Sequence, residues 1–288
     1  MTATLVAARL ERDVVIARGP GTADYLQGQL AQDVAALGDG DSAWSLLLEP
    51  QGKMVAVLRI TRATVDEYLL DVDTGWADAV VARLERFKLR TACDFTAVRW
   101  PAISYRGPGA EAVEADAPIV AAAAWAGVEG VDVVGPDVAG LEVVAGAELV
   151  TAGQFDLLRI GAGWPAMGAE IDASTIPAAS GVVDIAASFT KGCYTGQELV
   201  ARIDSRGNNT PTRLVGLRAA PGTPVVAGAP VTVGGEPAGT VTSVATDSDG
   251  SVAALVYLRR AHEAAGVGEV GAEPGPATVE LLELPVRP

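Results

Sequence analysis

The pattern of apolar residues changes near residues 208–213, and this change limits the folds that the chain can adopt. Beyond it, short Val/Thr runs alternate with turn residues, as where residues 231–233 and 240–244 flank Gly234 and Gly235. Two apolar runs around a Gly-Gly pair are typical of a β-hairpin. Because several such short strands follow at close spacing, the last third predicts a small β-barrel or β-sandwich.

The first two thirds of the chain mix helical and strand patterns instead. Apolar residues recur at helical spacing in three segments, the first of which has Thr22 as its predicted N-cap. The predicted helices are residues 22–37, 76–87 and 153–160. The predicted strands are residues 43–48, 54–60, 67–72 and 93–98, with a short strand near 121–126. Helices and strands mixed in this way indicate an α+β unit with a largely antiparallel sheet.

Composition narrows the classes of function. The chain has 288 residues, of which 49% are hydrophobic and 20% charged, and this predicts a folded protein of about two domains. It carries 21 Lys+Arg against 36 Asp+Glu, a formal net charge of -15, so direct nucleic-acid binding is not expected. Since no segment resembles a signal peptide or a membrane span, we expect a cytoplasmic protein without a membrane partner.

Cysteine and histidine are too few for several kinds of site. The chain has two cysteines, Cys93 and Cys193, and one histidine, His262. A structural zinc site needs four such ligands, so no metal site and no disulfide framework are expected. Cys93 falls in an apolar strand pattern, which predicts a core position. The polar neighbours of His262 predict a surface position.

Residues 191–198, Lys-Gly-Cys-Tyr-Thr-Gly-Gln-Glu, are the segment whose pattern points to chemistry. Thr195 and Glu198 have the spacing of a capping box, which predicts a helix that begins at Thr195. Cys193 would then precede the helix N-terminus, where free N–H groups and the helix dipole favour a thiolate, and Lys191 would add to that effect. The alternative is that Cys193 is buried and inert and that the capping box is only structural.

Tryptophans offer a second, weaker indication. A flat heterocycle such as a pterin stacks well on an indole ring, but large aromatic side chains more often pack in a core or between domains. We therefore expect core or domain-seam positions for the tryptophans that were weighed as stacking platforms, which are Trp44, Trp76, Trp100 and Trp164.

The segment 191–198 resembles the K-G-C-Y-x-G-Q-E signature of the YgfZ-type proteins, which belong to the GcvT-like aminomethyltransferase superfamily. Three further segments are similar to motifs of that family and occur in the expected order. Residues 25–30 resemble Y-L-Q-G-Q, residues 49–54 resemble P-x-G-K, and residues 159–170 resemble R-I-x-x-G-x-P-x-x-G-x-E. The matches cover most of the first two thirds of the chain, and the β-rich last third agrees with them.

This resemblance implies an α+β protein with a GcvT/YgfZ-like three-part ring. Two interleaved α+β portions would occupy residues 1–208, one of them roughly residues 43–106, and a C-terminal β-barrel of residues 209–288 would close the ring. The implied cofactor is tetrahydrofolate, or a one-carbon derivative of it, in the central channel. The implied function is the maturation or repair of iron–sulfur clusters through transient contacts with carrier or client proteins, with an indirect effect on tRNA modification.

The same resemblance implies roles for particular residues. Cys193 would be the essential thiol, as a nucleophile or a transient cluster ligand, and Lys191 would tune it or meet an anionic ligand. Because a cluster usually takes four Cys ligands, one thiolate would not hold it alone. The residues expected to contact folate or shape its pocket are Tyr194, Gln197, Glu198, Arg202, Gln29 and Lys53, of which Glu198 would mainly cap the helix.

One departure separates the chain from the glycine-cleavage branch of the superfamily. The G-x-x-D-D motif of that branch falls on residues 52–56, where Val55 and Ala56 replace the catalytic carboxylates. An aliphatic side chain does not act as a general base, so whether the chain is an enzyme stays open. The alternatives are a folate-dependent one-carbon (aminomethyl) transferase acting on an unknown amine, and a non-catalytic module whose folate only stabilises the fold.

Overall fold

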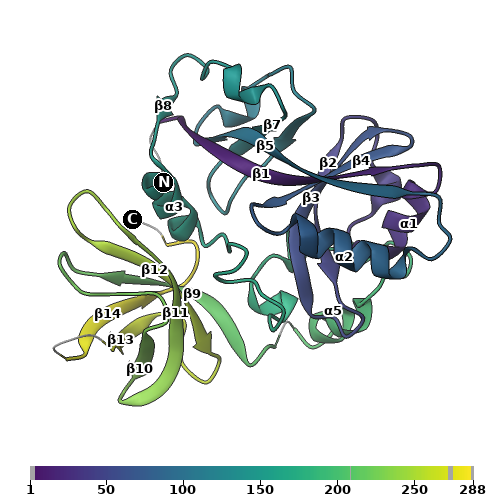
Figure 1. Cartoon of the computed structure of the whole chain (residues 1–288). Coiled ribbons are helices and arrows are strands. Elements are labelled where there is room, and N and C mark those ends of the chain that lie inside the picture. Colours follow the sequence, from purple (N-terminus) through teal and green to yellow (C-terminus); the bar gives the residue numbers. More distant parts are fainter. Residues whose placement is uncertain (1–3, 208, 272–274, 287–288) are drawn as a thin grey trace.

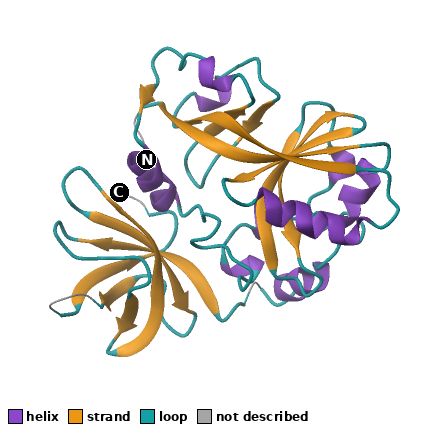
Figure 2. Cartoon of the chain, viewed as in Figure 1, coloured by secondary structure: helices purple, strands orange, loops and turns teal. Residues whose placement is uncertain are grey.

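The structure is a computed structural model that describes residues 4–207, 209–271 and 275–286. A large sheet and a closed barrel are its two main parts (Figures 1 and 2). The strands of the large sheet are β1 (Val6–Arg18), β2 (Ser42–Leu48), β3 (Met54–Thr64), β4 (Glu67–Asp73), β5 (Asp94–Arg106), β6 (Ile119–Ala122), β7 (Gly130–Val134) and β8 (Glu148–Leu149). The barrel strands are β9 (Thr212–Ala219), β10 (Pro230–Val233), β11 (Glu236–Thr246), β12 (Val252–Arg259), β13 (Gly266–Val270) and β14 (Ala277–Leu282). The helices are α1 (Thr22–Gln29), α2 (Ala77–Lys88), α3 (Ala152–Ala162), α4 (Val183–Ala186) and α5 (Gln197–Asp204), with 3-10 helices η1 (Val34–Ala36), η2 (Ala110–Ala112), η3 (Val138–Gly140) and η4 (Pro177–Ala179).

Strand β1 organises the large sheet, whose order is β2-β3-β4-β1-β5-β7-β6. All these neighbours are antiparallel, and β8 adds a parallel pair to β1. The 13 residues of β1 pair with β5 along its whole length. The sequence patterns did not predict β1, because charged residues such as Arg12 and Asp13 interrupt its apolar alternation. Strand β5 likewise extends well beyond the predicted residues 93–98.

The last third forms the predicted barrel, closed in the order β10-β11-β12-β9-β14-β13. Gly234 and Gly235 connect β10 to β11, as the hairpin pattern predicted. Aliphatic side chains fill the interior, among them Leu217, Val256 and Leu258, which have no exposed surface. Burial of these side chains in a closed set of strands stabilises the barrel and leaves no free strand edge.

Helix α3 lies between the two main parts (Figure 1). It packs against β1 on one side and against β11 and β12 on the other. The chain then returns to the large sheet, where α4 contacts β2, before it enters the barrel. The chain therefore passes from the large sheet to α3 and back to the large sheet. The end of α3 lies at the seam between the large sheet and the barrel. The division into domains at residues 208 and 209 stays a prediction.

The first predicted helix is shorter than expected. Helix α1 ends at Gln29, and its N-cap is Gly21 and not the predicted Thr22, which is buried with no hydrogen-bond partner for its hydroxyl. Past α1 the chain bends at Leu30 and forms only the short η1. Tertiary contacts outweigh helical periodicity here, because Leu30 forms a bridge with Leu47 of β2.

Candidate functional site

The motif loop, residues 191–196, leads into α5. The helix begins at Gln197, its N-cap is Gly196 at φ 85°, and no side chain caps it. The predicted capping box is therefore wrong. Thr195 Oγ1 lies 3.3 Å from Gln29 Oε1, because the left-handed Gly196 turns the chain so that Thr195 meets α1 and not its own helix.

The predicted cap residue Glu198 forms a different contact. It is exposed and pairs with Arg202 one turn along α5, at 2.8 Å. At the first turn of α5 the contact with the preceding loop comes from Gln197. Its Oε1 accepts a hydrogen bond from the backbone N–H of Tyr194 at 3.0 Å. Tyr194 packs against the main core, and burial raises the pKa of its hydroxyl.

Two glycines let the motif loop touch the turn between β2 and β3. A Cβ atom on Gly196 would lie 2.6 Å from Glu49 O, and one on Gly52 would lie 2.4 Å from Leu199 Cβ. Real Cβ contacts are longer, so both positions require glycine. Two segments far apart in the sequence thus meet at the start of α5.

Lys191 anchors the motif loop to the end of α1. Its Nζ donates hydrogen bonds to three backbone carbonyls, those of Gln27 at 2.6 Å, Leu30 at 2.9 Å and Gln32 at 2.8 Å. These bonds match the three donors of an ammonium group. Burial lowers the pKa of Lys191 to about 8. The Nζ also lies 5.4 Å from the centroid of the Tyr194 ring.

The two cysteines lie in opposite environments. Cys93 is buried in the main core, as predicted. Cys193 is exposed, which rules out the alternative that it is a buried, inert thiol. It sits between Lys191 and Thr195, two residues whose side chains are both turned toward α1 or its end. The structure therefore presents one accessible thiol on a well-anchored loop.

The other predicted residues lie at different distances from this loop. Gln29 joins it, since its Oε1 contacts Thr195 and accepts a hydrogen bond from Arg83 at 3.1 Å. Lys53 instead donates to the carbonyl of Ser174 at 2.6 Å and is bound to a neighbouring loop. Gln29, Lys191, Tyr194 and Gln197 thus gather around the motif loop, but none of the eight predicted residues lines any of the five cavities described for this structure.

A cavity of about 400 Å³, here called the tryptophan cavity, lies between the large sheet and the α3 region. Its aromatic lining residues are Trp44, Trp125, Phe155 and Trp164. Its charged lining residues are Glu11, Arg12, Asp73, Arg106, Asp132, Asp156 and Arg159. The rings of Trp44 and Trp164 lie 4.8 Å apart between centroids. Trp44 and Trp164, two of the four tryptophans considered in the sequence, therefore line this cavity.

A buried network of arginines and aspartates underlies the tryptophan cavity. Arg59 binds Asp71 at 2.9 Å and Asp132 at 3.1 Å. Arg12 also binds Asp71, at 3.0 Å, and Arg106 binds Asp132, at 2.9 Å. Burial alone would raise the pKa of Asp132, but the charges of Arg106 and Arg59 hold it well below its usual range. The network is thus ionised and internally paired.

Arg106 is the member of this network with unused hydrogen-bonding capacity. Its side chain is 3% exposed, and its Nη1 bonds to Asp132 and to its neighbour's carbonyl. Its Nε has no hydrogen-bond partner among the described residues. The guanidinium carbon lies 4.2 Å from the centroid of the Trp125 ring. A buried donor without a partner is costly, so this position favours a polar ligand.

A second cavity of about 560 Å³, here called the seam cavity, adjoins the first. The two share Trp125, Trp164 and Pro165, and the seam cavity extends toward β9 of the barrel. Its lining is mostly apolar and includes Arg213, whose Nη2 donates to His262 O at 2.6 Å while its Nε has no described partner. An elongated ligand that enters the tryptophan cavity would continue into this space.

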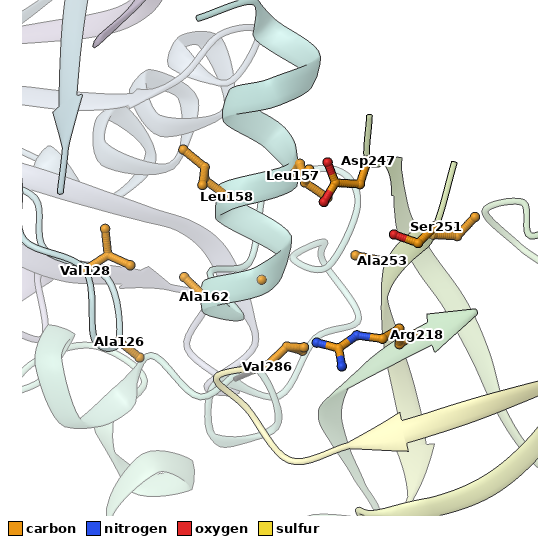
Figure 3. Close-up of a pocket in the computed structure, with 12 residues that line it drawn as sticks. Ala126, Val128, Leu157, Leu158, Ala162, Arg218, Asp247, Ser251, Ala253 and Val286 are labelled. Atoms are coloured by element: carbon orange, nitrogen blue, oxygen red, sulfur yellow. The ribbon is translucent and has the colours of Figure 1, made fainter. Parts of the chain in front are cut away.

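A third cavity of about 310 Å³ lies between part of α3 and the barrel (Figure 3). Leu157 and Leu158 of α3 line one side, and Asp247 and Ser251 of the barrel line the other. It shares only Ala126 and Ala162 with the seam cavity. The cavities therefore follow the seam between α3, the sheet and the barrel.

Sequence patterns did not reveal the buried charges beneath the tryptophan cavity, although a signal was present. Arg59, Asp71 and Asp132 each have an apolar residue on both sides in their strands. A charged residue at such a position is buried only if it is paired, so each one indicates a partner on another strand. Which strand supplies the partner depends on sheet order, which the sequence patterns did not contain.

The described residues contain neither a side-chain cluster suited to a metal ion nor a helix suited to a membrane span. Within residues 4–207, 209–271 and 275–286, no group of three or more His, Cys, Asp or Glu side chains is arranged to hold a metal ion. No helix among these residues is both long and apolar enough to cross a membrane.

Comparison with known proteins gives three findings. A scan against protein-family models gives no match. The chain is 31% identical over 219 residues to the tRNA-modifying protein YgfZ of an Enterobacter species, which covers 66% of this chain and 65% of that protein. It is 29% identical over 219 residues to the mitochondrial iron-sulfur cluster assembly factor IBA57 homolog of Mycosarcoma maydis, which covers 68% of this chain and 53% of that protein. The chain thus spans less than two thirds of either relative.

The fold has a close structural counterpart. The crystal structure of glycine cleavage system aminomethyltransferase T from Bartonella henselae matches 98% of this chain and 86% of that chain, with a TM-score of 0.81 and 22% sequence identity. This match confirms the predicted GcvT-like α+β fold. Together, the sequence relatives and the fold support the resemblance of the chain to YgfZ-type proteins of the GcvT-like aminomethyltransferase superfamily.

Proposed function

We propose that the chain is a tetrahydrofolate-binding accessory protein for the maturation or repair of iron–sulfur clusters, with an indirect effect on tRNA modification. Its relatives include a tRNA-modifying protein and an iron-sulfur cluster assembly factor. One observation carries the folate part. Arg106 lines a cavity of about 400 Å³ whose walls include three tryptophans, and its buried Nε has no hydrogen-bond partner among the described residues.

The residues of the tryptophan cavity fit a reduced folate. The flat pterin ring offers faces to indole rings, which favour stacking, and polar edges to groups such as Arg106 and Ser104. The cavity volume falls within the range of about 300–1,000 Å³ that is usual for small-molecule sites. The adjoining seam cavity would accept the rest of the molecule, with Arg213 as the cation available to its carboxylates. When bound, tetrahydrofolate supplies a carrier for one-carbon units.

An accessory role fits the site better than aminomethyl transfer does. A transferase of this fold would need a group that accepts a proton. Val55 and Ala56 carry none, and Asp71, Asp73 and Asp132 each bind an arginine. The low pKa of Asp132 makes that carboxylate a weak base. These three carboxylates therefore serve as fixed charges that orient the arginines.

We assign the contact with iron–sulfur proteins to Cys193. The thiol is exposed on a loop that Lys191 fixes to α1, so it is accessible and held in place. One thiolate does not retain a cluster, since clusters usually take four Cys ligands. Cys193 would therefore act as a nucleophile or as a transient ligand while a carrier or client protein is docked. Lys191 acts as a positioning residue in this proposal, and the proposed location is the cytoplasm.

Calorimetric titration with tetrahydrofolate tests the folate part. We expect binding by the wild type and by Cys193→Ser, because the thiol lies outside the cavity. Arg106→Met removes a hydrogen bond to a charged group, worth roughly 1.5–3 kcal/mol, and should weaken binding about tenfold or more. Trp164→Leu should weaken it as well and keeps the charged network intact. Equal affinity in the wild type and both cavity variants would overturn the proposed site.

Genetic complementation tests the thiol. In a strain that lacks this protein and has lost activity in cluster-dependent enzymes, Cys193→Ala should fail to restore that activity, whereas Arg206→Met, at an exposed position just past α5, should restore it. Full rescue by Cys193→Ala would remove Cys193 from the mechanism. Turnover of methylene-tetrahydrofolate by the purified protein with any amine would favour the transferase alternative instead.

A further inference from the structure

A fourth cavity, here called the α2 cavity, lies beside α2 and has no part in the proposed function. Its volume is about 310 Å³. Its larger lining side chains are Met54, Val55, Trp76, Glu49, Arg83 and Arg86. The cavity therefore combines an apolar wall with a small group of charges, and it shares no residue with the tryptophan cavity.

Arg83 is the buried charge of this cavity. Its side chain is 2% exposed. Its Nε donates to Leu48 O at 2.9 Å and its Nη1 donates to Gln29 Oε1 at 3.1 Å. Its Nη2 is buried and has no hydrogen-bond partner among the described residues. Because a guanidinium carries five donors in a fixed fork, the unused nitrogen is held in a defined position beside two that are already bonded.

Glu49 does not neutralise this charge fully. Its Oε2 lies 3.8 Å from Arg83 Nε and 3.9 Å from Arg86 Nη1, both beyond hydrogen-bond distance. Two guanidinium groups thus face one carboxylate that is itself 34% exposed. The lining of the cavity carries one positive charge in excess, in a chain whose net charge is -15.

We propose that the α2 cavity binds a small anionic group, a carboxylate or a phosphate. Arg83 Nη2 would donate a charge-assisted hydrogen bond to it, and Arg86, which is 68% exposed, would close over it from the cavity mouth. An apolar part of the same ligand would lie against Trp76 and Met54. The site does not depend on folate binding.

The position of the site links it to the motif loop. Gln29 Oε1 accepts a hydrogen bond from Arg83 and lies 3.3 Å from Thr195 Oγ1, two residues beyond Cys193. The turn that carries Glu49 also touches Gly196. An anion that draws Arg83 toward it and repels Glu49 therefore acts on two contacts that hold the loop of Cys193.

Titration of the full chain with inorganic phosphate and, separately, with acetate tests the proposal. Ionic strength is held constant with chloride, and the arginine Nε–H resonances are followed by NMR. We expect a saturable shift of the Arg83 resonance, and the tighter of the two anions identifies the preferred class. Arg86→Met removes an exposed charge and should weaken binding by about two- to fivefold. Glu49→Gln removes the competing carboxylate and should tighten binding by a similar factor.

The matched control is Arg90→Met, which removes an exposed arginine just past α2 that does not line the cavity. It should leave the affinity unchanged. The proposal is overturned if neither anion shifts the Arg83 resonance. It is also overturned if Arg86→Met, Glu49→Gln and Arg90→Met all bind the anion equally well, since the contact would then be an adventitious ion only.

Discussion

The large sheet and the barrel fill their interiors in opposite ways. Among the described barrel residues, no charged side chain is buried, and the interior is aliphatic. The large sheet buries several charges instead, including Arg59, Asp71, Arg106 and Asp132. Buried ion pairs seldom add stability over apolar residues of the same volume. The difference therefore indicates that the barrel core serves stability alone. The buried charges of the large sheet instead shape the tryptophan cavity, which we propose as the folate site.

The largest expected effect comes from removing the centre of the charged network. Arg59→Met leaves Asp71 and Asp132 short of a buried cation, and breaking such a pair costs roughly 3–5 kcal/mol of unfolding free energy. Chemical denaturation of the purified variant measures this. A loss below about 1 kcal/mol, as for exposed pairs, would show that the network is hydrated and would undermine the comparison.

The stability of the barrel should depend on the volume of its buried side chains, since none of those described is charged. Leu217 has no exposed surface in the barrel core, so Leu217→Ala should cost about 3 kcal/mol through lost burial and the remaining cavity. Its affinity for tetrahydrofolate should stay that of the wild type, since Leu217 lines none of the described cavities. A large loss of ligand affinity at full folding would contradict the purely structural role of the barrel core.

Asp13 tests a third kind of buried charge, one that caps a helix from a distant strand. Its Oδ2 accepts hydrogen bonds from the N–H groups of Gly75, Trp76 and Ala77 at 2.7, 3.1 and 3.2 Å, at the start of α2. Removing such a cap costs about 1–2 kcal/mol. Asp13→Asn should therefore unfold at lower denaturant concentration than the wild type at neutral pH.

The same residue gives a pH dependence of known sign. Burial alone would raise the pKa of Asp13, but hydrogen bonds from Arg99 and the amides of Ala77 and Gly75 together lower it below its ordinary value of 3.8. The unfolded chain therefore binds the proton more readily, and the stabilisation is complete above pH 3.8 and is lost as the pH falls below it. The difference between wild type and Asp13→Asn should shrink over that acidic range. A difference that stays constant with pH would assign the cap to neutral hydrogen bonding alone.

Local patterns predicted the parts of the fold that local sequence determines. The helix expected over residues 76–87 is α2, because its apolar residues and its basic last turn all lie within one segment. The hairpin around Gly234 and Gly235 was predicted for the same reason, because its pattern lies within one short segment. Strand β1 and the true end of α1 were missed, since the first depends on pairing with β5 and the second on contacts with Lys191 and Leu47.

The site shows the same division. The motif of residues 191–198 was found because its eight residues are contiguous, but the exposure of Cys193 was left open by the sequence and is shown by the structure. The tryptophan cavity was not found, because Arg12, Arg106, Asp132 and Trp164 come from separate parts of the chain and meet only after the sheet and α3 are assembled. The resemblance named folate but placed it on residues that do not line that cavity, namely Tyr194, Gln197, Glu198, Arg202, Gln29 and Lys53.

The smallest effect is expected from an exposed ion pair on β1 and β4, two of the strands that carry the buried network. Arg18 of β1 faces Glu67 of β4 at 2.6 Å, with 63% and 27% of the side chains exposed. Because water and salt screen such a pair, the denaturation midpoint of Arg18→Met should equal that of the wild type within error, at low and at high salt. Arg12 lies on the same strand and also pairs with β4, but it is largely buried. A clear loss of stability in Arg18→Met would mean that position along β1, and not burial, decides which charges of the sheet matter.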